Sequence, residues 1–183
     1  HGCPWDENVT LVAARMGHLN ILRYALQHGC AIHKDSINGA CAFDNVDLVT
    51  LLHEYNAPWG TDACDMAAGC GHLEVLQYLH ENHCPWDEAT TDWAAFNGEL
   101  ITLEYAIRNG CPWSEDVLRR AALCGRLDCL QFLADQTLYM DVNGSLFGAA
   151  LRQGHYKCVE YLLDTSYAFM NYVFDDTLDD LLL

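Results

Sequence analysis

The chain has 183 residues, about half of them apolar, and its 26 acidic residues against 9 basic ones give a formal net charge of -17. This charge excludes sequence-independent binding to nucleic acid or to anionic membranes, because both need a basic surface. It is compatible with a basic partner, or it only keeps an apolar-rich chain in solution. No segment is typical of a signal peptide or of a membrane span.

A short sequence, Cys-Pro-Trp-Asp-Glu with small variations, returns along the chain at intervals of 27 residues or twice that distance. A fixed period of this size is typical of stacked-repeat proteins. We predict six units over residues 1–165 and, because terminal repeats need a polar outer face, a cap or a partial repeat over residues 166–183. The units begin near Gly2, Gly29, Asn56, His83, Gly110 and Thr137.

Each unit is predicted to form two short helices. The alanine pair 13–14 lets a neighbouring helix approach the first helix closely, and Gly17 then ends that helix in a left-handed conformation. The second helix follows at once, and its apolar residues are spread so widely that we expect it to be buried on several sides. Side chains that accept backbone N–H groups favour helix starts, and the expected N-caps of the first helices are Asp6, Asp87 and Ser114.

Four of the ten cysteines occupy one position of the repeat: Cys3, Cys30, Cys84 and Cys111. Neighbouring units of a helical stack lie roughly 10 Å apart, whereas the Cα atoms of a disulfide lie within about 7 Å of each other. Equivalent cysteines therefore do not pair. We interpret them as small buried apolar residues of a protein in a reducing compartment, the cytoplasm.

The same repeated sequence contains a tryptophan, which we expect to pack each link against the next unit. As a platform for stacked bases these rings are disfavoured, because the acidic charge opposes nucleic acid. The tryptophans are Trp5, Trp59, Trp86 and Trp113.

A second pattern, Ala-Ala-x-x-Gly-His-Leu-x-x-Leu, ends each first helix and opens each second one, most clearly at residues 13–22 and 67–76. Over about 165 residues the chain thereby resembles the ankyrin-repeat family. Its unit is shorter than the usual length of about 33 residues, and the missing residues fall where an ankyrin repeat forms its β-hairpin finger. The resemblance implies an all-α solenoid of helix-turn-helix repeats with short links that lack β-hairpin fingers.

The short Gly-Cys-Pro-Trp-Asp-Glu form is similar to the ankyrin arrays of large DNA viruses of amoebae and of some protists. Ankyrin proteins are non-catalytic binding modules, so the resemblance implies a scaffold or adaptor that binds a protein partner and needs no cofactor. If the chain is viral, its location is the host cytoplasm or the virion. The alternative is a structural component that self-associates, for example in a virion or a filament.

Motifs for catalysis and metal binding are missing from the sequence. It contains no Gly-rich phosphate loop, no Gly-x-Ser-x-Gly, no His-Glu-x-x-His and no Cys-x-x-Cys. We therefore predict neither enzyme activity nor a metal site. His18, His72 and His155 share the position after the turn glycine, where we expect each to order its turn by side-chain hydrogen bonds.

The candidate binding residues lie late in the first helices, where side chains vary from unit to unit while the frame persists. In ankyrin-like repeats these positions face the concave groove, and an exposed apolar stripe often marks an interface. The alternative is that the shortened links let these side chains pack between units. The predicted stripe consists of Met16, Phe43, Cys70, Phe96 and Leu123, and its predicted polar edge consists of Asp65, Asp92 and Arg119.

Overall fold

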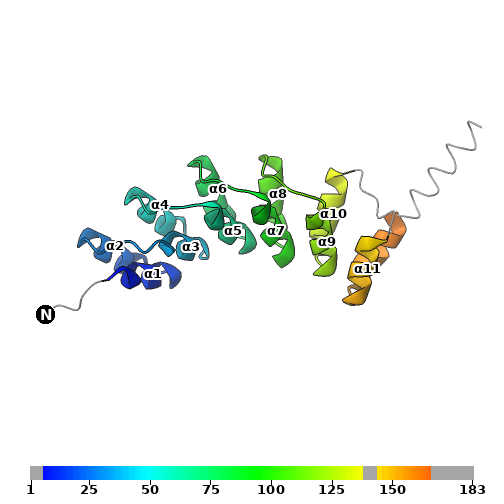
Figure 1. Cartoon of the computed structure of the whole chain (residues 1–183), viewed down its shortest axis with the longest axis horizontal. Coiled ribbons are helices and arrows are strands. Elements are labelled where there is room, and N and C mark those ends of the chain that lie inside the picture. Colours follow the sequence, from blue (N-terminus) through cyan, green and yellow to red (C-terminus); the bar gives the residue numbers. More distant parts are fainter. Residues whose placement is uncertain (1–5, 138–143, 166–183) are drawn as a thin grey trace, which may run out of the picture. The chain divides into compact units, whose positions relative to one another are not determined.

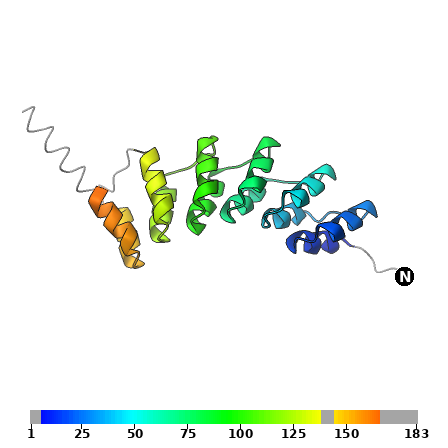
Figure 2. The same ribbon diagram turned by 180° about the vertical axis from the view of Figure 1, so that it is seen from behind.

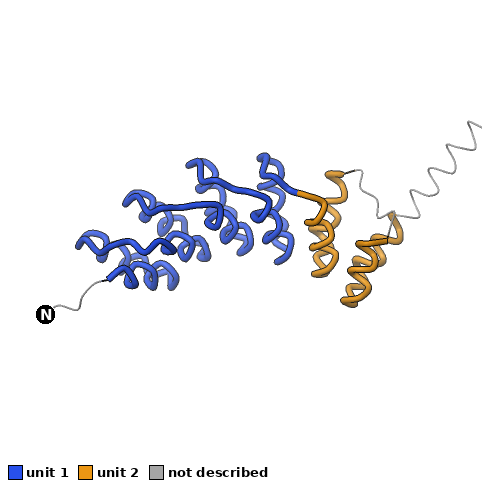
Figure 3. The backbone as a smooth tube through the Cα atoms, in the orientation of Figure 1, with its two compact units in different colours: residues 1–113 blue, residues 114–183 orange. Residues whose placement is uncertain are grey.

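The structure, a computed structural model of the chain, describes residues 6–137 and 144–165. The chain forms two compact units, residues 1–113 and residues 114–183 (Figure 3). Over the described residues all regular secondary structure is helical, which confirms the predicted all-α class. The cap or partial repeat predicted over residues 166–183 lies outside the described residues, and the division into six repeats stays a prediction.

The first unit is built from helix pairs. The first helices of the pairs form one row and the second helices form another (Figures 1 and 2). The pairs are α1 (Glu7–Arg15) with α2 (Leu19–Gln27), α3 (Ser36–Cys41) with α4 (Val46–Glu54), α5 (Thr61–Gly69) with α6 (Leu73–Glu81), and α7 (Glu88–Asn97) with α8 (Leu100–Arg108).

Two of the predicted N-caps start their helices as expected. Oδ1 of Asp6 accepts the backbone N–H of Asn8 at 3.1 Å, and Oδ1 of Asp87 accepts that of Ala89 at 2.9 Å. Each bond supplies a partner for a donor that the first helical turn leaves unsatisfied. The Asp residues of the repeated sequence therefore fix where α1 and α7 begin.

A left-handed glycine follows the first helices α1 and α5, as predicted. Gly17 and Gly71 have φ angles of 72° and 76°, a conformation that glycine adopts readily. The next N–H then reaches back five residues, from His72 to the carbonyl of Ala67 at 2.9 Å. This Schellman arrangement satisfies the last carbonyls of the helix and turns the chain directly into α2 or α6.

The links between pairs are short because the second helices end in the same way. The N–H of Cys84 bonds to the carbonyl of Leu79 at 2.9 Å, and the N–H of Cys111 bonds to that of Ala106 at 2.9 Å. The chain then passes through Pro-Trp into the next first helix. Neither the links nor any other described residues contain a strand, which confirms that β-hairpin fingers are missing there.

Small residues of the first helices and leucines of the second helices form the core of the first unit. Ala67 and Ala68 of α5 are fully buried, as are Leu76 and Leu79 of α6. The alanines bring the helix backbones close together, and the leucines fill the space between the rows. The predicted burial of the second helices is confirmed for these side chains.

The second unit contains α9 (Asp116–Leu123), α10 (Leu127–Gln136), α11 (Ser145–Arg152) and helical residues 156–165. Helix α9 packs against both α10 and α11. The N-cap predicted at Ser114 is wrong. Glu115 takes that place, with a helical backbone (φ -62°, ψ -19°) and no capping hydrogen bond from its side chain.

Candidate functional site

The predicted stripe residues of the first unit are exposed at the ends of the first helices. Met16 is 57% exposed, Phe43 and Phe96 are each 39% exposed, and Cys70 is exposed as well. Leu123, which belongs to the second unit, is 37% exposed at the end of α9. These exposed fractions do not fit the alternative, in which the side chains are buried between helix pairs. Their part in binding stays a prediction.

Two further apolar residues of the first unit lie near the predicted ones. Met66 of α5 is 39% exposed and Trp93 of α7 is 50% exposed. Each lies one helical turn ahead of a predicted residue, so it shares that residue's face of the helix. Trp93 meets Phe96 edge-on, with ring centroids 5.8 Å apart. We call the following set the apolar stripe: Met16, Phe43, Met66, Cys70, Trp93 and Phe96.

Glycines of the preceding helix pair lie next to two aromatic residues of the apolar stripe, next to the ring of Phe43 and next to Cβ of Trp93. A Cβ atom at Gly17 would lie 3.0 Å from Cε1 of Phe43, and a Cβ atom at Gly69 would lie 3.1 Å from Cβ of Trp93. Both aromatic residues therefore rest directly on bare backbone. A side chain held by such packing loses little conformational entropy when a partner binds.

The residues of the predicted polar edge make contacts within the protein. Oγ1–H of Thr90 donates to Oδ1 of Asp65 at 2.7 Å, and this bond joins α7 to α5. Asp65 and Asp92 are both half-buried. In the second unit, Arg119 forms an ion pair with Asp116 at 3.1 Å. A role for these residues at the edge of a binding surface stays a prediction.

Burial raises the pKa of Asp65 to about 6; the Thr90 hydroxyl lowers it in part, and the carboxylates of Asp87 and Asp62 raise it further. The value in the unfolded chain is about 4, so the folded state binds the proton more tightly. The stabilisation from this proton is therefore present below about pH 4 and is lost as the pH rises through about 6.

Asp65→Asn is expected to raise the free energy of unfolding at pH 7.5 by about 1 kcal/mol, a figure reduced because the group is partly exposed. The amide keeps an acceptor for Thr90 and carries no charge. At pH 4 the variant and the original chain are expected to unfold at nearly the same urea concentration. Glu74→Gln, which changes an exposed carboxylate of α6, is the control. A gain of equal size at both pH values would contradict the assignment to Asp65.

Two of the hydrogen bonds between successive helix pairs end on carbonyls at the end of a first helix. The carbonyl of Ala42 can only accept, so Nε2 of His72 donates to it, at a distance of 3.0 Å. Oγ1–H of Thr102 donates to the carbonyl of Ala68 at 2.8 Å. The bond from His72 supplies a partner for a carbonyl at the end of a helix, and the carbonyl of Ala68 also accepts the N–H of Gly71 at 3.2 Å. The prediction that His72 orders its own turn is wrong, because the backbone already closes that turn and the ring bonds to the preceding pair.

The repeated cysteines are buried thiols. The S–H groups of Cys84 and Cys111 donate to the carbonyls of Gly60 and Asp87, at 3.4 and 3.3 Å. Burial raises the pKa of Cys111 to about 12, and the charge of Asp87 adds to this effect. The thiol therefore stays protonated and unreactive near neutral pH. All cysteines of the described residues are free, and for Cys30, Cys84 and Cys111 this agrees with the prediction that equivalent cysteines do not pair.

The tryptophan of the third link stacks on a histidine. The rings of Trp86 and His80 lie 4.1 Å apart, and the rings of Trp86 and Tyr105 meet edge-on at 6.4 Å. Nδ1 of His80 also lies 2.9 Å from the hydroxyl oxygen of Tyr105. Because Tyr105 belongs to the next helix pair, the predicted packing of the link against the next unit is confirmed for Trp86.

Within residues 6–137 and 144–165, no group of His, Cys, Asp and Glu side chains is arranged to hold a metal ion. No helix of the same residues is long and apolar enough to cross a membrane.

No protein-family model and no curated protein matches the sequence. Among solved structures 273 chains match, so the fold by itself does not select one function. One of them is the human ASB11 ankyrin repeat domain, with a TM-score of 0.70 and 20% sequence identity, over 85% of this chain and 82% of that one. At this identity the likeness shows the fold alone. The chain thus has the fold of an ankyrin repeat domain, an all-α solenoid of helix-turn-helix repeats.

Proposed function

We propose that the chain is a non-catalytic scaffold or adaptor that binds a protein partner through the apolar stripe, on the face that corresponds to the concave groove of ankyrin repeats. We further propose that it is a short-unit ankyrin-repeat protein of the form found in large DNA viruses of amoebae and in protists, and that it acts in the cytoplasm. The ankyrin fold, generally an interaction module, supports this proposal. The observation that carries it is the row of exposed apolar side chains on the first helices.

The apolar stripe has the properties of a binding hot spot. Hot spots are rich in aromatic residues, and they gain affinity when their side chains are fixed before the partner arrives. The ring of Phe43 packs against Gly17, and the rings of Trp93 and Phe96 meet edge-on. These three rings are the residues that we propose as anchors.

The charge of the chain supports a basic partner. Exposed carboxylates lie at the starts of the first helices, near Asp6, Glu7, Asp62, Asp87 and Glu88, and the whole chain carries a net charge of -17. We infer that the partner segment combines apolar side chains, which contact the apolar stripe, with flanking Lys or Arg. Such a pairing speeds association and weakens as salt is added.

Selection of random peptides displayed on phage against the immobilised chain tests the proposed function. We expect the enriched peptides to combine aromatic or aliphatic residues with Lys or Arg, and their binding to weaken with salt. Enrichment of acidic peptides would contradict the charge argument. Sedimentation of the chain alone tests the self-assembly alternative, because a mass that is independent of concentration favours the adaptor.

A further inference from the structure

Arg15, the last residue of α1, is the one basic residue of the four first helices of the first unit. Its side chain is exposed, and it directly precedes Met16 of the apolar stripe. The charges in the first turns of α1, α5 and α7 are all acidic, from Glu7, Asp62 and Glu88. Glu7 and Arg15 are eight residues apart, which separates them by about 12 Å along the helix. The positive charge therefore lies at the opposite end of α1 from the carboxylate.

The aliphatic stem of Arg15 lies over bare backbone of α3. A Cβ atom at Gly39 would lie 2.6 Å from Cγ of Arg15, so a side chain at this position would displace the stem. In the later pairs the same repeat position carries a large exposed side chain, Met66 in α5 and Trp93 in α7. The stem of Arg15 therefore occupies the space in which a side chain at this repeat position would begin.

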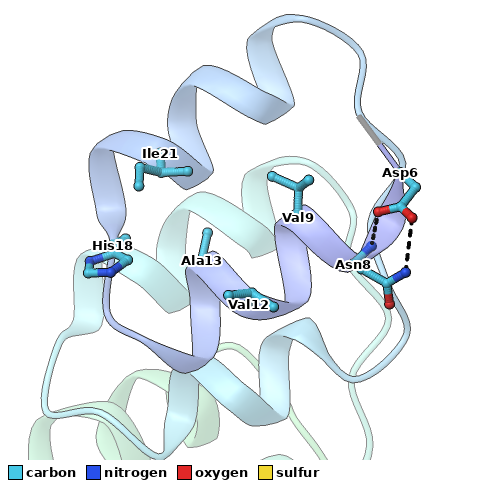
Figure 4. Close-up of a pocket in the computed structure, with 7 residues that line it drawn as sticks. All are labelled: Asp6, Asn8, Val9, Val12, Ala13, His18 and Ile21. Atoms are coloured by element: carbon cyan, nitrogen blue, oxygen red, sulfur yellow. Dashed lines mark hydrogen bonds between the residues drawn. The ribbon is translucent and has the colours of Figure 1, made fainter. Parts of the chain in front are cut away.

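Exposed apolar side chains lie near Arg15 on both helices that it contacts. On α1, Val12 is 55% exposed one helical turn before Arg15 and Met16. Val12 also lines a cavity of about 330 Å³, which is formed by residues of α1 and α2 (Figure 4). On the side of α3, the exposed ring of Phe43 packs against Gly17. A partner that covers these apolar residues therefore also covers Arg15.

Within the described part of the chain, the guanidinium group of Arg15 makes no hydrogen bond and no ion pair. By contrast, Arg108 of α8 and Arg119 of α9 each pair with a carboxylate of their own helix, at 3.0 and 3.1 Å. A charged group that loses its water without gaining an acceptor lowers affinity, whereas one carboxylate accepts two N–H groups of an arginine at once. A partner that covers this end of α1 is therefore favoured when it brings an acceptor to Arg15.

We propose that Arg15 determines specificity at the apolar stripe by binding an Asp or Glu side chain of the partner segment. This assignment rests on the proposed function, because contacts with the apolar stripe bring the carboxylate to Arg15. The partner segment then has a fixed orientation, with its acidic residue at the end of α1 and its Lys or Arg residues at the helix starts. A segment that has only apolar and basic residues leaves Arg15 unpaired and binds less tightly.

Phage selections run in parallel against the original chain and against Arg15→Gln test this assignment. Gln keeps the Cβ and Cγ atoms that lie over Gly39 and removes the charge, so we expect the variant to fold. The original chain is expected to select one Asp or Glu at a fixed place in an otherwise apolar and basic peptide, and Arg15→Gln is expected to select peptides without it. Arg23→Gln, which changes an exposed arginine of α2, is the matched control and is expected to select the same peptides as the original chain.

A double-mutant cycle then measures the pair, with a labelled peptide from the selection on the original chain. Replacing the acidic residue of the peptide by its amide is expected to weaken binding to the original chain about tenfold and to leave binding to Arg15→Gln unchanged.

No weakening on the original chain would overturn the assignment, whether or not Arg15→Gln folds. Equal weakening on both proteins would overturn it too, and so would an acidic residue that Arg15→Gln also selects. These results would leave the proposed function in place, as long as the peptides still combine apolar and basic residues. Selected peptides without apolar residues would overturn the proposed function, and the assignment with it.

Discussion

Replacing Trp86 by alanine is expected to lower the free energy of unfolding of the first unit by about 3 kcal/mol, the low end for a large core aromatic residue because the ring is half-buried. The substitution removes the stacking on His80 at 4.1 Å and the edge contact with Tyr105 at 6.4 Å. It also opens the hydrogen bond between His80 and Tyr105 to water. Urea unfolding followed by circular dichroism measures the loss.

Trp93→Ala is the matched control, since it removes the same side chain from a position that is 50% exposed. We expect it to cost less than about 1 kcal/mol, the usual size for a surface change. A loss below about 1 kcal/mol for Trp86→Ala would show that this link tryptophan does not hold neighbouring helix pairs together. Equal losses in the two variants would lead to the same conclusion.

The double variant Phe43→Ser, Phe96→Ser is expected to stay folded and to weaken partner binding by about 100-fold or more, which corresponds to about 2.7 kcal/mol. Both rings are 39% exposed, so the core keeps most of its contacts, whereas the proposed surface loses two of its three anchors. Fluorescence anisotropy with a labelled peptide from the display selection measures the affinity.

The matched control for this double variant is Tyr55→Ser, Ile101→Ser, which removes two exposed apolar side chains outside the apolar stripe. It is expected to bind the peptide like the original chain. If the Phe43, Phe96 variant unfolds, the two rings belong to the core. If it folds and binds normally, the partner site lies elsewhere.

The sequence allowed the helices, the glycine turns and the short links to be predicted, because each depends on residues close together in the chain. Asp6 and Asp87 cap helices through neighbours two residues away, and Gly71 sets its own backbone angle. Because the sequence repeats, the same local signals occur in several helix pairs. The prediction of an N-cap at Ser114 was wrong because a helix start can shift by one residue with small changes in the backbone angles.

The contacts of the candidate site were harder to predict, because they join different helix pairs. Met66 and Trp93 hold the same position in successive units. Whether their side chains are exposed depends on which face of each first helix the neighbouring helices leave open. The bond from Thr90 to Asp65 needs both the register and the relative rotation of two helices. That rotation is set by packing in three dimensions, which a single sequence does not display.

The bonds between helix pairs have a consequence for how the first unit folds. The bond of Thr91 with Pro112 joins residues 21 positions apart, and the bond of Thr102 with Ala68 joins residues 34 positions apart. Contacts of such short sequence separation go with fast folding, because little loop entropy is lost before they form. Folding can begin at any one pair and spread to its neighbours. The rate is then governed by the closing of single interfaces, and no step requires distant ends of the chain to meet.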